Sequence, residues 1–238
     1  MTYLASKIVM PIAQVLFFTL LGTFATGKDT ANFYIIGNAM QIAAVSGIYG
    51  VTMSIGGDRW NGTLPYLFGT PANRLVLFVG RAFLHIIDGM LGVVIAFLWG
   101  VILLGLDLSN TNLLALALTI LITTYSTSGL GLLMGCLSLI TLNVMFVNNT
   151  VYFALLLFSG ANIPVQILPE LLRAISFVLP LTRGIAAARM LITGATFREV
   201  VPLLTGEFIV GSLYVVLGFI LFRWFEIQAK RRGSLETV

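Results

Sequence analysis

Charged residues, cysteine and histidine are all scarce in this sequence. Only 9% of the 238 residues are charged, 58% are hydrophobic, and the mean hydropathy is +1.03. A soluble domain of this length cannot cover so much apolar surface, so the composition predicts an integral membrane protein. The single cysteine, Cys136, excludes an internal disulfide and a Cys-x-x-Cys metal pair, and we interpret it as a small packing residue.

Positive charge is too dispersed to predict a nucleic-acid partner. The net charge is +4, and the basic residues are scattered or stand at the ends of apolar segments. No repeat, low-complexity tract or linker divides the chain, so we expect one domain over residues 1–238.

Long apolar segments make up most of the chain. Six of them reach or approach the length of about 20 residues that a membrane-spanning helix needs. They are residues 8–26, 34–55, 82–104, 113–135, 144–159 and 203–225, and the fifth is short unless it begins near Leu139. Continuous runs of this length suit helices rather than the alternating strands of a barrel. The sequence therefore predicts an all-α integral membrane protein with six transmembrane helices in the lipid bilayer.

The distribution of basic residues predicts how these helices are oriented. An even number of spans places both termini on one side of the membrane. The tail after the sixth segment carries Lys230, Arg231 and Arg232, and most of the 13 Lys and Arg residues fall on the same side. An excess of positive charge marks the cytoplasmic side, so both termini are expected to be cytoplasmic.

The longest polar interruption in the first half of the chain is residues 56–81, which read GGDRWNGTLPYLFGTPANRLVLFVGR. Thr63 can cap a helix, Pro65 suits a first helical turn, and Pro71 disfavours helix at the residue before it. These signals predict a short helix over about residues 64–69. Because it lies between the second and third spans, this helix is expected to face the cytoplasm.

The connection between the fifth and sixth spans, residues 160–202, also differs from a simple loop. It contains Pro164, Pro169 and Pro180, and the apolar pieces between these prolines are too short to cross a membrane. We expect re-entrant half-helices in the outer leaflet, where protein covers the non-helical turns. The alternative is an ordinary external loop with amphipathic helices.

Several polar side chains fall inside the apolar segments. Asn38 and Gln41 share one face of the second, and Asn148 and Asn149 lie in the fifth. Amides in hydrocarbon face protein or a water-filled path rather than lipid. These four residues therefore either join helices by hydrogen bonds or line a translocation path.

Ionisable residues within the apolar segments are also candidates for function. His85 and Asp88 lie three residues apart on one face of the third segment. They could form a proton relay. The alternative is a structural role, in which their polar atoms pair with each other, with Arg81 or with water. Glu207 is expected to be solvated at the outer interface or to pair with Arg198.

One stretch comes close to a phosphate-binding loop. Residues 22–29, GTFATGKD, match the Gly-x-x-x-x-Gly-Lys part of that motif, but Asp29 stands where Ser or Thr would meet magnesium. The stretch follows an apolar helix rather than a strand, so we interpret the match as coincidence. Any nucleotide hydrolysis must then come from another chain.

Two ordered motifs resemble the ABC type 2 permease family, the membrane subunits of ABC exporters. The family pattern of an acidic-Arg pair, Gly-Thr-Leu and Thr-Pro is met by Asp58, Arg59, Gly62, Thr63, Leu64, Thr70 and Pro71. The family also has a second motif in the outer segment before the last span. The matching residues here are Phe158, Ser159, Gly160, Pro164, Leu168, Pro169, Pro180, Leu181 and Thr182. Two departures are Pro65, which replaces the usual acid, and Leu179, which replaces the common Asn.

The resemblance implies a type V exporter architecture in a bacterial or archaeal cell membrane. Two permease subunits, identical or different, would pair around a central path, and two copies of an ATP-binding subunit would dock below. ATP and magnesium would belong to that partner, and this chain would bind no cofactor and no metal. The cargo would be hydrophobic or amphipathic, such as a drug or a lipid-linked or peptide-like molecule.

The resemblance also assigns roles to residues. The short cytoplasmic helix would be a coupling helix, formed with its flanks by Asp58, Arg59, Trp60, Gly62, Thr63, Leu64, Pro71 and Arg74. An outer gate would include Ser159, Gly160, Pro164, Pro169 and Pro180. We expect Asp58, Arg59, Trp60 and Arg74 to be exposed for docking.

Other classes stay open at this point. An ion- or proton-coupled secondary transporter would use His85 and Asp88 and would work without an ATPase. A membrane-embedded enzyme is disfavoured because no cluster of His, Cys and acidic residues has catalytic spacing. A receptor or structural subunit would need no open path.

Overall fold

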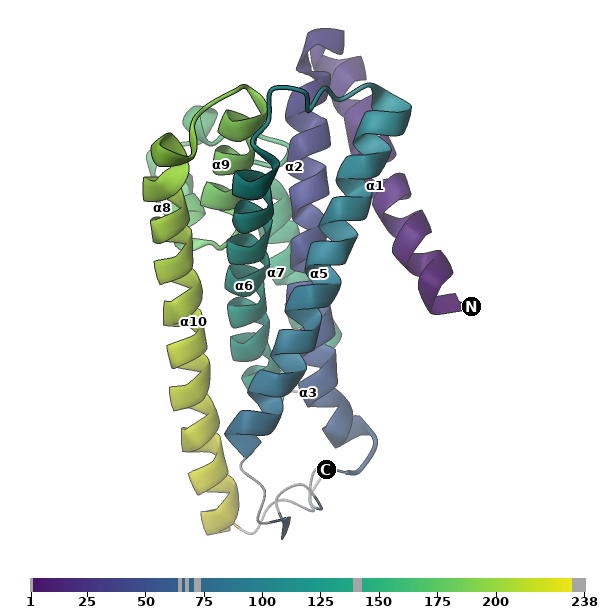
Figure 1. Ribbon diagram of the computed structural model, residues 1–238. Coiled ribbons are helices and arrows are strands. Elements are labelled where there is room, and N and C mark those ends of the chain that lie inside the picture. The colour runs from purple at the N-terminus through teal and green to yellow at the C-terminus, as the bar shows by residue number, and fades with distance from the viewer. Residues whose placement is uncertain (1, 64–65, 67–68, 71–73, 139–142, 233–238) are drawn as a thin grey trace.

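The protein is a bundle of helices packed side by side along one direction (Figure 1). The computed structural model describes residues 2–63, 66, 69–70, 74–138 and 143–232, and this part of the chain contains no strand. The elements are α1 (Thr2–Thr26), η1 (Lys28–Thr30), α2 (Ala31–Ala44), η2 (Val45–Gly50), α3 (Val51–Trp60), α5 (Arg74–Leu104), α6 (Leu113–Ser138), α7 (Val144–Phe158), η3 (Val165–Ile167), α8 (Glu170–Val178), α9 (Thr182–Ile192) and α10 (Phe197–Arg232). The all-α prediction is confirmed.

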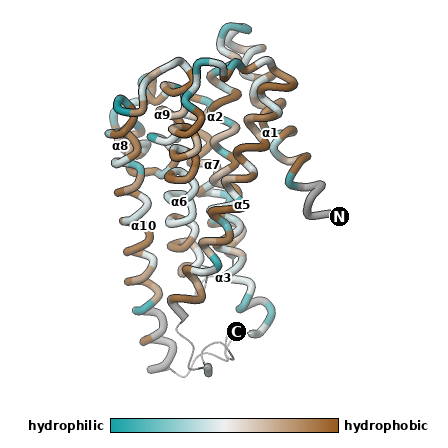
Figure 2. Tube along the Cα trace, viewed as in Figure 1, coloured by the Kyte–Doolittle hydropathy of each residue, from teal (hydrophilic) through white to brown (hydrophobic). Residues whose placement is uncertain are grey.

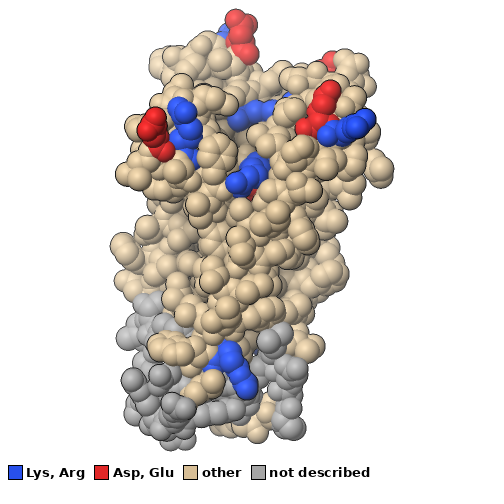
Figure 3. Space-filling model, turned by 90° about the vertical axis from the view of Figure 1, so that its left-hand side faces the viewer, with Lys and Arg blue, Asp and Glu red and all other residues tan. Residues whose placement is uncertain are grey.

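Five helical segments are long and apolar enough to cross a membrane. They are Lys7–Thr26, Lys28–Asp58, Val76–Leu104, Leu113–Ser138 and Phe197–Trp224. Figure 2 shows hydrophobic residues along most of their length. On the face shown in Figure 3, a broad band without charged side chains separates the charged groups at the two ends. The membrane class and five of the six predicted spans are confirmed.

The fifth predicted span is the short one. Helix α7 has 15 residues, or about 22 Å of helix, which is less than the apolar core of a bilayer. Residues 139–142, where this span was expected to begin, lie outside the described residues. The count of six spans stays a prediction.

We call the end of the bundle that carries residues 61–73 the lower end. The upper end carries the α1–α2 and α5–α6 connections together with α8 and α9 (Figure 1). Helices α2 and α6 lie inside the bundle, α10 packs along α6, and α1 lies outside α2 and α5. The main core is therefore formed where α2, α5, α6 and α9 meet.

The second span is interrupted at its middle by the π-helical turn η2. This turn passes very close to α6: a Cβ atom on Gly131 would lie 1.8 Å from the carbonyl oxygen of Gly47. A side chain at Gly131 would therefore push the two backbones apart. Single π-turns inside α-helices recur at functional sites. The span expected over residues 34–55 lies within the single segment Lys28–Asp58, in which α2, η2 and α3 follow one another directly.

Two predicted helix boundaries were wrong. Helix α5 begins at Arg74 rather than residue 82, because Leu77 and Phe78 pack against the core at the lower end. The connection between α3 and α5 is therefore residues 61–73, shorter than the predicted 56–81. Helix α10 begins at Phe197 rather than residue 203 and contains Pro202, since proline is tolerated in membrane helices.

The segment between α7 and α10 forms two short helices, as predicted. The axes of α8 and α9 meet at 87°, and both lie at the upper end of the bundle (Figure 1). Pro164 and Pro169 stand directly before η3 and α8, and Pro180 lies in the bend before α9. The prolines set the breaks between these helices, while a re-entrant position in the membrane stays a prediction.

Candidate functional site

The root of the lower connection is fixed by an ion pair between two helices. Arg81 on α5 donates from Nη1 to Asp58 Oδ2 at 2.6 Å and from Nη2 to Oδ1 at 3.4 Å. The same Nη1 also donates to the carbonyl oxygen of Ser54. The Asp58 side chain is only 16% exposed, so the expectation that it is free for docking was wrong. Its carboxylate instead ties the end of α3 to α5.

The chain leaves α3 through a tight turn. Thr63 N donates to Asp58 O at 2.9 Å, and Thr63 Oγ1 donates to the same oxygen at 3.2 Å. The Thr63 hydroxyl also lies 3.2 Å from Asp58 Oδ1. Gly62 has φ +66°, a conformation that favours glycine. Thr63 therefore closes the turn on the end of α3, and Gly62 supplies the backbone conformation it needs.

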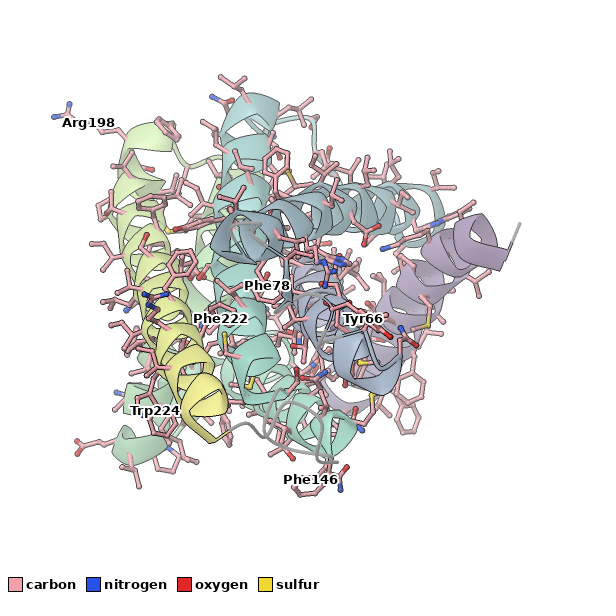
Figure 4. All side chains as sticks on the ribbon, turned by 90° about the horizontal axis from the view of Figure 1, so that it is seen from below. Tyr66, Phe78, Phe146, Arg198, Phe222 and Trp224 are labelled. Atoms are coloured by element: carbon pink, nitrogen blue, oxygen red, sulfur yellow. The ribbon has the colours of Figure 1, made fainter. Side chains whose placement is uncertain are left out.

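The surface beyond this turn is exposed. Asn61, Gly62 and Thr63 are exposed, and the Tyr66 side chain is 78% exposed at the lower end (Figure 4). An exposed tyrosine beside a turn is typical of a binding surface. Tyr66 was not among the residues singled out from the sequence, although an aromatic residue within a polar loop is a recognisable signal.

Some of the predicted coupling residues cannot be placed in detail. The backbones of Arg59 and Trp60 belong to α3, and that of Arg74 begins α5. Their side chains lie outside the described part of the chain. Leu64 and Pro71, and most of the short helix predicted over residues 64–69, also lie outside it, so that helix stays a prediction.

A small hydrophobic core sits directly above the ion pair. The rings of Phe78 on α5 and Phe222 on α10 meet edge to face with centroids 4.8 Å apart (Figure 4). The Arg81 guanidinium lies 5.8 Å from the Phe78 ring centroid. Around them are buried side chains of α3 and α6: Val51, Ile55, Leu132 and Cys136. The lower end thus joins α3, α5, α6 and α10, and the packing role expected of Cys136 is confirmed.

The polar residues of the second span are engaged with the upper connection. Asn38 donates to Tyr34 O at 3.0 Å and to Asn162 Oδ1 at 2.9 Å. Gln41 Oε1 lies 3.4 Å from the Ser159 hydroxyl. Asn38, Gln41 and Ser159 are completely buried. For Asn38 and Gln41 the structure supports the interpretation as interhelical hydrogen bonds. It also places Gln41 beside Ser159, the first residue of the predicted gate.

The two asparagines of α7 differ in environment. Asn148 is completely buried, and its side-chain oxygen and nitrogen make no hydrogen bond within the described chain. Asn149 is exposed and accepts a hydrogen bond from Tyr49 on η2 at 2.6 Å. An exposed amide on a membrane helix is costly against lipid. The α7 face that carries Asn149 is therefore suited to protein or water.

The bend between α8 and α9 is held by a buried carboxylate. Glu207 on α10 accepts hydrogen bonds from Leu181 N at 2.6 Å and from Arg183 N at 3.2 Å. Leu181 has φ +85°, which is strained for a residue with a side chain. Glu207 is completely buried, so its expected solvation or pairing with Arg198 was wrong. The carboxylate instead satisfies the first N–H groups of α9.

A second contact holds α9 to the rest of the upper end. Arg189 Nη2 donates to Gly160 O at 2.8 Å, to Phe33 O at 3.0 Å and to Ala161 O at 3.3 Å. Its guanidinium lies 3.6 Å from the centroid of the Phe33 ring. Gly160 has φ +85°, which brings its carbonyl into this cluster. Sequence reasoning missed Arg189, because nothing local indicates its distant acceptors.

The predicted group of His85 and Asp88 is in contact with α1 and η2. Asp88 Oδ2 accepts from Lys7 on α1 and from the Ser46 hydroxyl at 2.5 Å. His85 lies beside Gly50, where a Cβ atom would be 2.3 Å from its Nδ1. Pairing of Asp88 with Lys7 joins α1, η2 and α5. Asp88 therefore has a structural partner on α1, and the proton relay stays a hypothesis.

The near-match to a phosphate-binding loop lies where α1 turns into η1. It follows a helix that ends at Thr26, and Gly27 has φ +99° in the turn. Helix α1, described from Thr2, therefore stands where the motif requires a strand.

Helix content and apolar length define the chain as a multi-pass helical membrane protein. A family model described as ABC-2 type transporter matches residues 1–193. The chain therefore belongs to the ABC-2 type transporter family, whose domain is a transmembrane permease and not an ATPase. The family expectation from the two motifs is confirmed. No curated protein matches the sequence.

Proposed function

We propose that the protein is the permease half of an ATP-driven exporter, and that the lower end is its coupling site. The observation that carries the proposal is the root of the 61–73 connection. Asp58 and Arg81 join α3 to α5, and Phe78 and Phe222 join α5 to α10. A push on this connection would therefore move three helices together rather than bend one loop.

Such a push would come from a separate ATP-binding subunit. The proposed contact surface is the exposed turn of Asn61, Gly62 and Thr63 with Tyr66, flanked by Arg59, Trp60, Leu64, Pro71 and Arg74. Two copies of the subunit would bind ATP and magnesium and close on each other. Closure would then be transmitted as a rigid-body displacement of α3 and α5.

The permease itself is proposed to act as a dimer, with a second copy or a related subunit. The support is the exposed face of α7, where Asn149 lies beside exposed Met145 and Phe146. An amide at this position avoids lipid if a partner or a water-filled path covers it. The path would run along this face, with Asn149 among its lining residues and the buried Asn148 behind it.

The cargo and the location follow from the same proposal. An apolar bundle with few charges suits a hydrophobic or amphipathic molecule, moved outward across a bacterial or archaeal cell membrane. Both termini and residues 61–73 would be cytoplasmic. Ser159, Gly160 and the three prolines of the α7–α10 connection would form the outer gate.

The experiment replaces Arg59 and Thr63 together with alanine in the complete transporter reconstituted in liposomes. The double variant should retain ATP hydrolysis and insertion in the membrane but lose transport. Arg198→Ala is the matched control, because Arg198 points away from the bundle at the upper end (Figure 4). Normal transport by the double variant would contradict the coupling role.

A further inference from the structure

The upper end contains a pocket that adjoins the proposed outer gate, since Ser159 and Gly160 form part of its lining. It has a volume of about 290 Å³ and lies among the start of the α7–α10 connection, α8, α9 and α10. Three arginines line it: Arg173 on α8, and Arg183 and Arg189 on α9. Lys and Arg side chains lie at the upper end of the face shown in Figure 3, with Asp and Glu side chains beside some of them.

The three arginines of this pocket outnumber the acidic groups close to them. No acidic side chain of the described residues lines the pocket. The ion pairs found in the described part of the chain involve other residues, not these three arginines. Glu207 is close to Arg183, but it is completely buried and both its oxygens accept backbone N–H groups. Glu207 can offset one guanidinium charge at most, so the pocket keeps positive charge that suits an external anion.

Each arginine is held in place by a backbone carbonyl. Arg173 Nη2 donates to Gln166 O at 2.6 Å, Arg183 Nη1 to Phe177 O at 2.7 Å, and Arg189 Nη2 to Gly160 O at 2.8 Å. A guanidinium carries five N–H donors, so each group keeps others for a ligand. Fixed guanidinium groups of this kind recognise carboxylate and phosphate oxygens.

Buried donors at the pocket also lack partners. Thr182 is 5% exposed and lines the pocket, and its Oγ1 has no hydrogen-bond partner within the described chain. The buried Nε of Arg189 likewise has none. Buried polar atoms are nearly always hydrogen-bonded, so these two donors are available to a ligand in the pocket. A hydroxyl and a guanidinium N–H both donate well to an oxyanion.

The geometry points to a binding site for a phosphate-class oxyanion in this pocket. Arg173, Arg183 and Arg189 supply charge, and Thr182 supplies a hydroxyl. Val165, Phe177 and Leu203 complete the wall with apolar surface. A lipid headgroup and a small soluble molecule are the two sources of such a phosphate, and they share this chemistry.

The test uses the purified chain in a phosphate-free maltoside detergent and measures binding by native mass spectrometry. The probes are phosphatidic acid, a diacylglycerol with the same acyl chains, and inorganic phosphate against chloride. We expect phosphatidic acid to bind and diacylglycerol not to bind. Tighter binding of phosphatidic acid than of inorganic phosphate assigns the site to a lipid, and equal binding assigns it to a soluble oxyanion.

Variants show whether the bound phosphate occupies this pocket. Arg183→Gln should weaken binding about tenfold, the loss of one charge-assisted contact, while Arg183→Lys should retain more of it. Arg173→Gln tests the opposite wall if Arg183→Gln fails to fold, as judged by circular dichroism. Arg198→Gln removes an exposed charge outside the pocket and should have no effect. Absence of binding by both phosphate probes, or equal weakening by Arg198→Gln, overturns the site.

Discussion

Arg81 and Asp58 close the base of the bundle, with Arg81 Nη1 2.6 Å from Asp58 Oδ2. Asp58 lies near the end of α3, and Arg81 lies on α5. The exposed connection between these helices therefore begins and ends beside the same ion pair. Both side chains are largely shielded from solvent. The ion pair therefore holds α3 and α5 together, and we call it the joint. The proposed docking surface lies in the exposed residues that follow it in the chain, from Asn61 onward.

Breaking this joint should uncouple the two activities of the transporter. Asp58→Asn and Arg81→Gln each remove the ion pair and should cost about 1–2 kcal/mol of local stability. We expect more ATP to be hydrolysed for each molecule transported, as measured in liposomes containing the ATP-binding subunit. The exchanged pair Asp58→Arg with Arg81→Asp should recover part of the coupling. Unchanged coupling in both single variants would argue against the joint.

Close contact of η2 with α6 requires a glycine at position 131. Gly131→Ala places a methyl group against the Gly47 carbonyl oxygen and should destabilise the protein by about 3 kcal/mol. Thermal unfolding in detergent measures the loss. Gly80→Ala is the control, since a Cβ atom there meets nothing within 4 Å. Equal melting temperatures for the two variants would show that the helices are not packed in this way.

The buried Glu207 carboxylate should stabilise the bend between α8 and α9 at the upper end. Glu207→Ala leaves the N–H groups of Leu181 and Arg183 unpaired in a buried place and should cost about 3 kcal/mol. Glu207→Gln keeps an acceptor oxygen and should cost less. Hydrogen exchange of α9 reports the loss, with exposed Glu170→Gln as the control. Unaltered protection of α9 in Glu207→Ala would contradict the capping role.

Pairing of Lys7 with Asp88 predicts a structural rather than a proton-carrying role. Lys7→Asp and Asp88→Lys should each loosen α1 and lower the melting temperature, and the double exchange should restore much of it. Transport by Asp88→Asn should keep the pH profile of the unaltered protein. A flattened pH profile in Asp88→Asn, without loss of stability, would instead support a proton relay.

The sequence predicted the class and most of the helices, because long apolar runs are required by the bilayer itself. It also located the breaks of the upper connection, since Pro164, Pro169 and Pro180 stand at or beside helix starts. Boundaries at residues 74 and 197 were missed. Packing against the bundle extends α5 and α10 toward their N-termini, through polar residues in α5 and through Pro202 in α10.

Contacts between distant residues could not be predicted from local patterns. Lys7 and Asp88 are 81 positions apart, and Arg189 lies 156 positions from Phe33. An acidic residue in an apolar helix is a candidate for function, so Glu207 could be singled out from the sequence. Nothing in the sequence identified the N–H groups that donate hydrogen bonds to it. Partners such as these depend on which helices become neighbours.

A photo-crosslinking measurement tests the coupling surface most directly. Benzoylphenylalanine replaces Tyr66 in the connection at the lower end, or Leu114, which is 76% exposed at the upper end of α6. Both variants are irradiated in membranes that contain the ATP-binding subunit. The proposed coupling site predicts a crosslink to that subunit from position 66 and none from position 114. No crosslink from position 66, or equal crosslinks from both, would contradict it.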